Sequence, residues 1–221
     1  MDTIQAILSR HSVRSFKSDP VPREIIWKIL EAANRCPSTA NTRPWQVYVA
    51  GGEVLDKIRQ AMSARFAGGE SIRPDIPLTL EWPPALKARI DQNRGERFKV
   101  LGIDRQDKAA LKANQGLNYL FFGAPVAIFL CMERSLGYWS IFDLGALTQT
   151  ILLAATHYGL GSIPALNFVG YPDIIRQELQ IPESLTLVFG IALGYPDPED
   201  PINQYRSARQ PLQEIATFKG L

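Results

Sequence analysis

The stretch from about Ser140 to Tyr158, SIFDLGALTQTILLAATHY, consists almost entirely of apolar and small residues. A helix with apolar residues on all sides is stable only when it is buried on most of them. Gly159 and Gly161 follow directly and are typical of a helix end. The rest of the chain must therefore supply the elements that cover this helix.

Hydrophobic periodicity predicts further helices and strands along the chain. The predicted helices cover about 3–10, 22–35, 53–66, 107–121, 140–158 and 174–179. The predicted strands cover about 45–50, 126–132 and 185–193, with a strand edge or loop at 162–168. Because helices and buried strands alternate, we expect one layered domain over residues 1–221.

Two segments depart from this pattern. Residues 67–106 contain four prolines and many charges without a regular period, although Ala85–Phe98 could form a polar helix. A segment this long is typical of a lid or an excursion from the core. The C-terminal segment 195–221 is polar at first and then regains apolar residues at Leu212, Ile215 and Phe218. We expect it to be an arm that packs on another subunit.

Composition excludes several classes of function. The net charge is only +2 over 221 residues, which argues against a nucleic-acid or anionic-membrane partner. Cys36 and Cys131 are far apart and predict neither a disulfide framework nor a zinc site. The chain has only two histidines, which argues against a histidine-rich metal centre. The N-terminus has no basic region followed by a long apolar run, which predicts a cytoplasmic protein without a signal peptide.

The sequence RHSVR gathers Arg10, His11, Ser12 and Arg14 just after the first helix. In an extended segment, Arg10, Ser12 and Arg14 lie on the same side. Two guanidinium groups and a hydroxyl suit a phosphate, which arginine binds bidentately. A solvated surface with ordinary ion pairs explains this segment equally well.

Three other segments are ambiguous when taken singly. The loop PSTANTRPW, residues 37–45, could bind a ligand or only cap its own backbone. The glycines of GLGSIP, residues 159–164, could admit a planar ligand or only end the helix. The segment NQYRSARQPL, residues 203–212, is a basic point in an acidic tail. No GxGxxG motif follows a strand, so a Rossmann site is not indicated.

Together, these segments resemble the FMN-dependent nitroreductase family along nearly the whole chain. The resemblance lies in six ordered segments: RHSVRSF, PSTANTRPW, FDLGALTQTILLAATHYGLGS, YPDIIRQELQIP, GIALGYPD and NQYRSARQPLQEI. It implies an α+β fold, a three-layer α/β/α sandwich with a mostly antiparallel mixed sheet. It also implies a homodimer that exchanges C-terminal arms and holds FMN at its interface.

The resemblance further implies which residues bind FMN. Arg10, His11, Ser12 and Arg14 would contact FMN, with Arg10 and Ser12 at the phosphate and Arg14 at the ring or ribityl chain. Arg209, with Arg206 as a second arginine, would close the phosphate site. Gly161, Ser162 and Ile163 would lie beneath the ring, while Ser38, Thr39 and Asn41 would come from the partner chain. Many relatives have glutamine where this chain has Arg43.

The implied activity is a ping-pong reduction of a small, electron-poor acceptor by NADH or NADPH. The chemistry would belong to the flavin, with no catalytic side chain. A nitroaromatic such as a nitrobenzoate is the favoured acceptor, with Arg89, Arg94 or Arg97 in the lid as partners for its carboxylate. The alternatives are a flavin, quinone or enone reductase, a reductive dehalogenase, a flavin-binding redox sensor or storage protein, and a binding module without flavin.

Overall fold

The computed structural model describes residues 1–79 and 81–220. Leu80 of the predicted excursion and Leu221 of the predicted arm lie outside the described residues. The helices are α1 (Thr3–Ser9), α2 (Arg23–Ala33), α3 (Gly52–Ala67), α4 (Pro84–Leu101), α5 (Lys108–Gly116), α6 (Tyr138–His157) and α7 (Pro172–Leu179). The strands are β1 (Trp45–Gly51), β2 (Val126–Glu133), β3 (Gly161–Ala165) and β4 (Leu185–Gly194). Short 3₁₀ turns include η1 (Thr39–Asn41), η2 (Phe121–Gly123), η3 (Leu166–Val169), η4 (Pro201–Gln204) and η5 (Leu212–Glu214).

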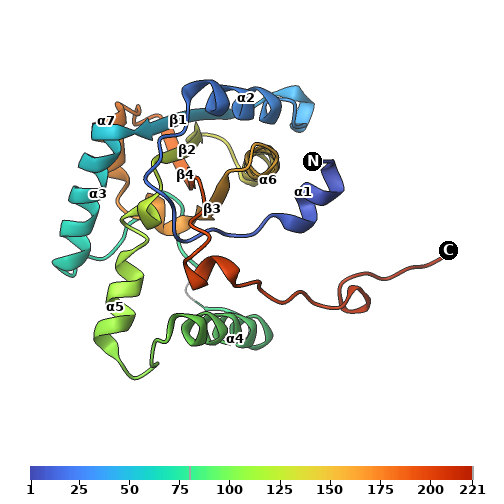
Figure 1. Cartoon of the computed structure of the whole chain (residues 1–221). Helices are drawn as coiled ribbons and strands as arrows, with labels where there is room; N and C mark the ends of the chain where they lie inside the picture. The colour runs from blue at the N-terminus through green and yellow to red at the C-terminus, as the bar shows by residue number, and fades with distance from the viewer. Residues whose placement is uncertain (80, 221) are drawn as a thin grey trace.

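The four strands form one sheet in the order β1-β2-β4-β3 (Figure 1). Each neighbouring pair is antiparallel. The expected α+β class is therefore confirmed, and among the described residues the one parallel pairing is a single bridge between Ser12 and Ser162. No helix within the described ranges has the length and apolar character needed to cross a membrane.

Both faces of the central strands are buried. In β2, Ala127, Phe129 and Cys131 belong to one hydrophobic cluster, whereas the intervening residues belong to another. Successive side chains of a strand point to opposite faces of the sheet. A wholly apolar strand therefore contributes to a cluster on each face when both faces are covered. A register shift between Leu130 and Cys131 places an extra residue, Val188, in β4. This bulge shifts the alternation of side chains in β4 by one residue. The strand contributes to both clusters.

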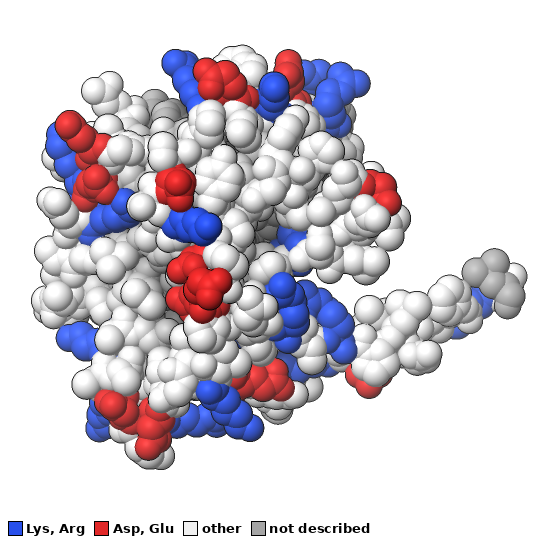
Figure 2. Space-filling model, viewed as in Figure 1, with Lys and Arg blue, Asp and Glu red and all other residues white. Residues whose placement is uncertain are grey.

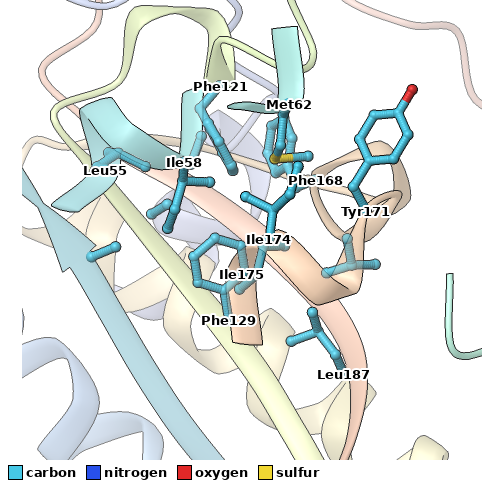
Figure 3. Close-up of a cluster of buried hydrophobic side chains, with 14 of the residues drawn as sticks. Leu55, Ile58, Met62, Phe121, Phe129, Phe168, Tyr171, Ile174, Ile175 and Leu187 are labelled. Atoms are coloured by element: carbon cyan, nitrogen blue, oxygen red, sulfur yellow. The ribbon is translucent and has the colours of Figure 1, made fainter. Parts of the chain in front are cut away.

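One face of the sheet packs against α3 and α7. Leu55, Ile58 and Met62 of α3 face Ile174 and Ile175 of α7 in this cluster (Figure 3). Its aromatic members include Phe121 and Phe168, whose ring centroids are 4.8 Å apart. Gly190 of β4 gives Phe168 its place, because a Cβ at Gly190 would lie 2.6 Å from the Cβ of Phe168.

The opposite face packs against α2 and α6, which completes three layers. Ile29 and Ala33 of α2 and Leu144, Ile151 and Leu152 of α6 are buried there. The prediction that α6 is buried on most sides holds only in part on this chain, because six of its 20 residues are buried and Gly145, Gln149 and His157 are exposed. The bulky side chains in the first turns of α6 are largely exposed. These side chains are Tyr138, Trp139 and Phe142.

Two helices differ from their predicted bounds, whereas α1 agrees. Asp2 caps α1, and Ile4 and Leu8 on its apolar face are exposed. Asp107 caps α5 as expected, yet the helix ends at Gly116 and Phe121 lies in η2. The polar helix in the excursion is longer than predicted, since α4 begins at Pro84 and runs to Leu101.

The first half of the predicted excursion, residues 67–83, is tied to the body by Asp75. This carboxylate accepts hydrogen bonds from the guanidinium of Arg176 and, at 2.8 Å, from the N–H of Leu187 in β4. Arg176 is 7% exposed and also donates to the carbonyls of Pro182 and Leu185. The segment is thus anchored at a buried ion pair before the chain enters α4.

Replacing Asp75 by alanine is expected to lower the free energy of unfolding by about 3 kcal/mol. Arg176 would remain buried, and its nearest remaining carboxylate would be that of exposed Glu183, 3.9 Å away. Asp173→Ala is the matched control, since its ion pair with Arg65 is exposed and is worth about 1 kcal/mol or less. Urea denaturation of both variants measures the difference. Equal losses would contradict a structural role for the Asp75 anchor.

Candidate functional site

The extended segment after α1 lies along the edge strand β3. The N–H of Val13 donates to the carbonyl of Ser162 at 3.1 Å, and Ser12 and Ser162 form the parallel bridge. Gly161 makes this approach possible, because a Cβ there would lie 2.6 Å from Cγ2 of Val13. Gly159 adopts a φ of +75° just after α6, which is the helix-ending role. The two glycines of GLGSIP thus have separate structural functions.

Asn203 of η4 joins this N-terminal segment to the C-terminal tail. Its Oδ1 accepts a hydrogen bond from the N–H of Arg14 at 2.8 Å. Its Nδ2 donates to the carbonyls of Ser15 and Asp197 at 2.7 and 2.8 Å. The side chain is 4% exposed, so these bonds lie away from water. This amide fixes the backbone on either side of the predicted site.

The two ends of the chain enclose a pocket of about 470 Å³. Its walls come from α1, the segment after α1, α4 and the root of the C-terminal arm. The lining residues are Ile7, Leu8, Arg10, His11, Ser12, Arg14, Asn93, Tyr205, Arg206, Ser207 and Arg209. We call this the terminal pocket. In Figure 2 basic side chains gather beside the root of the arm, which extends away from the body.

The terminal pocket is strongly cationic. It has four arginines in its lining and no carboxylate. The guanidinium groups of Arg206 and Arg209 donate to backbone carbonyls of their own segment at 2.8 and 2.9 Å, and neither forms an ion pair within the described residues. Burial and the nearby Arg209 lower the pKa of Arg10. Each arginine thus keeps donors and charge available for an anion.

The surroundings of His11 disfavour its protonated form. Burial is the main cause of its lowered pKa, and the charges of Arg206 and Arg10 lower it further. Its Nδ1 lies 3.0 Å from the carbonyl of Ser9. Because the proton on the ring is disfavoured, the positive potential of the pocket comes from the arginines.

Arg14 connects the terminal pocket to a second cavity. This cavity, about 270 Å³, is lined by Arg14, Arg97, Ile163 and Ala165 among others. Burial and the charge of Arg97 lower the pKa of Arg14 to about 10, so it remains protonated at neutral pH. We call this space the Arg14 chamber. Ile163 and Arg14 line it together.

The loop with Ser38, Thr39 and Asn41 lies elsewhere on this chain. It is fixed on α6, because the buried carboxylate of Asp143 accepts hydrogen bonds from Thr39 N–H at 3.1–3.2 Å. Asn41 Oδ1 accepts from Arg43 Nε at 3.2 Å, and Ser38 Oγ accepts from Arg43 N–H. These residues line neither the terminal pocket nor the Arg14 chamber. Their predicted role in a partner's site stays a prediction.

The structure therefore brings together the predicted residues from the two ends, and Ile163 near Arg14. Ser162 is 1% exposed, and its Oγ has no hydrogen-bond partner among the described residues. Arg94 and Arg97 line cavities, but Arg89, the third lid arginine, does not. Sequence reasoning missed Asn203, although it opens the segment NQYRSARQPL. The only signal for Asn203 in the sequence is an amide at the start of this basic segment.

The fold and the terminal pocket define an α+β protein with a cationic pocket between the two ends of its chain. Residues 7–195 match the Nitroreductase family. The chain belongs to this family and is an oxidoreductase.

Two of the similar proteins act on nitroaromatics. The chain is 34% identical to 4-nitrobenzoate reductase of Pseudomonas putida, over 97% of this chain and 94% of that protein. It is 33% identical to nitrobenzene nitroreductase of Ectopseudomonas oleovorans, over 96% of this chain and 94% of that protein.

Among solved structures, the FMN and NADPH-dependent nitroreductase NfnB from Sphigopyxis sp. strain HMH matches with a TM-score of 0.96 at 32% identity, over the whole of both chains. The FMN-dependent NfnB of Mycobacterium smegmatis, solved in complex with NADPH, matches with a TM-score of 0.93 at 30% identity. This match covers 98% of this chain and 97% of the M. smegmatis chain.

Asn203→Ala is expected to loosen the segment after α1, because the N–H of Arg14 loses its acceptor and the carbonyl of Ser15 keeps only the N–H of Asp197 as a donor. Hydrogen exchange at residues 12–16 should become about tenfold faster or more, which corresponds to the loss of one or two buried hydrogen bonds. Gln204→Ala is the control, since its amide is exposed and donates only to Pro198. Unchanged exchange in Asn203→Ala would show that this amide does not hold the segment.

Proposed function

We propose that the chain is an FMN-dependent nitroreductase that takes electrons from NADH or NADPH and reduces a small nitroaromatic, such as a nitrobenzoate, in the cytoplasm. The observation that carries this proposal is the terminal pocket, where arginines separated by almost the whole chain meet without a carboxylate. The family match and the FMN- and NADPH-dependent relatives support the choice of cofactor and donor. The nitrobenzoate relative supports the acceptor.

The residues present fit FMN. A phosphate dianion suits the terminal pocket because Arg10, Arg206 and Arg209 offer charge-assisted donors and Ser12 adds a hydroxyl. The pKa of Arg10 is lowered by burial and by a like charge, a cost that a bound anion would offset. The Arg14 chamber continues from this pocket toward Ile163 and Ala165, which leaves room beyond the phosphate site.

When bound, FMN supplies two-electron transfer between a nicotinamide and an electron-poor acceptor. The protein's own residues bind and orient. Arg10, Ser12, Arg206 and Arg209 hold the phosphate, and Arg14 offers a buried positive charge near the ring. The backbone of Gly161–Ile163 supports the ring, and Asn203 keeps Arg14 in place through its main chain. No side-chain nucleophile is required.

The proposal includes a homodimer that exchanges its C-terminal arms. Large apolar side chains are exposed on α1, at the start of α6 and on the arm. They are Ile4, Leu8, Tyr138, Trp139, Phe142, Leu212, Ile215 and Phe218. An exposed apolar surface of this kind is typical of an interface. The loop with Thr39 is fixed on α6 at Asp143, next to exposed Phe142. Its position supports the prediction that Ser38, Thr39 and Asn41 reach a partner's site.

The first test is spectroscopic. The purified protein, expected to be a dimer by sedimentation, should carry FMN absorbance that NADH or NADPH bleaches within seconds without oxygen. Added 4-nitrobenzoate should then restore it. Faster recovery with a quinone or with free flavin would favour those reductase activities. Absence of bleaching would favour a flavin-binding sensor, and a colourless protein that takes up no FMN would contradict the proposal.

The second test addresses the phosphate site. Arg10→Ala and Arg209→Ala should each weaken FMN binding by about tenfold or more, since a hydrogen bond between charged groups contributes about 1.5–3 kcal/mol. A chain truncated before Arg206 should lose FMN. Arg35→Ala, which lies outside the pocket, is the matched control. Fluorescence titration with FMN measures the dissociation constants, and unchanged values in both variants would refute the phosphate site.

A further inference from the structure

A third cavity lies between α4 and α5. Its volume is about 500 Å³, and Arg94, Arg97 and Arg105 line it together with the amides of Asn114 and Asn118. One carboxylate, that of Asp91, is also part of the lining. The described residues show no ion pair for any of these three arginines. We call this space the α4–α5 cavity. Its lining is rich in hydrogen-bond donors and carries excess positive charge.

The position of Arg105 in this cavity is built into α4. A Cβ at Gly95 would lie 1.6 Å from one terminal nitrogen of the Arg105 guanidinium. The guanidinium therefore lies directly on the helix backbone, where it donates to the carbonyl of Asp91 at 3.3 Å. Glycine in a helix interior is unfavourable in itself. Here it provides the space that the guanidinium of Arg105 occupies.

The α4–α5 cavity is continuous with the Arg14 chamber. Arg97, Phe98, Asn114, Asn118 and Asn167 line both. Arg97 joins them most directly, since its charge also acts on Arg14. Its Nε is buried and has no hydrogen-bond partner in the part of the chain that the structure describes. Burial, and to a lesser degree the charge of Arg94, lower the pKa of Arg97.

We propose that the α4–α5 cavity binds an oxyanion, a carboxylate or a phosphate, on the molecule that reacts in the Arg14 chamber. Arg94, Arg97 and Arg105 would bind its oxygens, with amides around them. The inference rests on the proposed function, which places the cofactor phosphate in the terminal pocket and leaves these arginines without an assigned anion. Two reactants carry this chemistry: a nitroaromatic with a carboxylate, and NADPH through its 2′-phosphate.

Binding of unreactive probes to the FMN-loaded protein tests the proposal without turnover. Benzoate against benzamide reports on the carboxylate, and 2′,5′-ADP against 5′-AMP reports on the 2′-phosphate. In Arg94→Gln, calorimetry should show about tenfold weaker binding of the anionic member of one pair, because a hydrogen bond between charged groups is lost. The neutral or unphosphorylated member should bind as before. The pair that responds identifies the reactant.

Two further variants sharpen the test. Arg89→Gln removes the same charge from an exposed position of α4 outside the cavity, and probe binding should stay unchanged. Gly95→Ala keeps every charge but displaces Arg105, so it should weaken the same probe as Arg94→Gln does. Unchanged binding in Gly95→Ala would overturn the role of Arg105.

Three outcomes overturn the proposal as a whole: no change in Arg94→Gln, equal changes in both members of a pair, or equal effects of Arg89→Gln and Arg94→Gln. Loss of FMN from Arg94→Gln would also overturn it, because the cofactor phosphate would then bind here. Failure of the proposed function gives a different result. The wild-type protein would hold no FMN, whereas the probe pairs could still be compared on the FMN-free protein.

Discussion

Three hydrogen bonds from one buried amide determine how the ends of this chain meet. Asn203 binds the N–H of Arg14 and the carbonyls of Ser15 and Asp197, across up to 189 residues of sequence. The sheet positions β3, and the segment after α1 adds to its edge at Ser12 and Ser162. The amide adds to main-chain hydrogen bonds between the same segments, among them those from Lys17 N–H to Tyr195 and from Asp197 N–H to Ser15. The geometry of the terminal pocket therefore depends on a residue that bears no charge.

The pocket also concentrates like charge. Arg10, Arg14, Arg206 and Arg209 share one space without a carboxylate, and Arg97 adds its charge from α4. Burial of unpaired charge opposes folding unless an oppositely charged group is supplied. The packed layers, with their two apolar clusters on either face of the sheet, provide the stability that allows this arrangement. Binding of an anionic ligand to such a site would therefore also stabilise the folded protein.

Much of the fold could be predicted from local pattern. Apolar runs located β2, β4 and α6, and Asp2 and Asp107 marked the starts of two helices, because periodicity and capping are properties of neighbouring residues. The exposure of Ile4 and Leu8 on α1 could not be predicted, since a helical pattern shows that a face is apolar and not what covers it. The same holds for Asp75, whose partners Arg176 and Leu187 are about a hundred residues away in sequence.

The candidate site was likewise predictable only in part from the sequence. Arg10, Ser12 and Arg14 were equally consistent with a solvated surface until the fold placed Arg206 and Arg209 beside them. Spacing within a segment gives the side on which residues lie, whereas their partners are set by the tertiary structure. Gly161 illustrates this limit, because the neighbour that requires a glycine there is the side chain of Val13. No local rule identifies such a contact.

The arm has a consequence for the life of the protein in a cell. Its C-terminal end extends away from the body (Figure 1), and Leu212, Ile215 and Phe218 are exposed on this chain. Segments that make few contacts open often, and proteases cut chains in such open states. A ligand bound by Arg206 and Arg209 would stabilise the root of the arm by mass action. The abundance of the protein would then follow the supply of that ligand, so that unfilled copies are the first to be degraded.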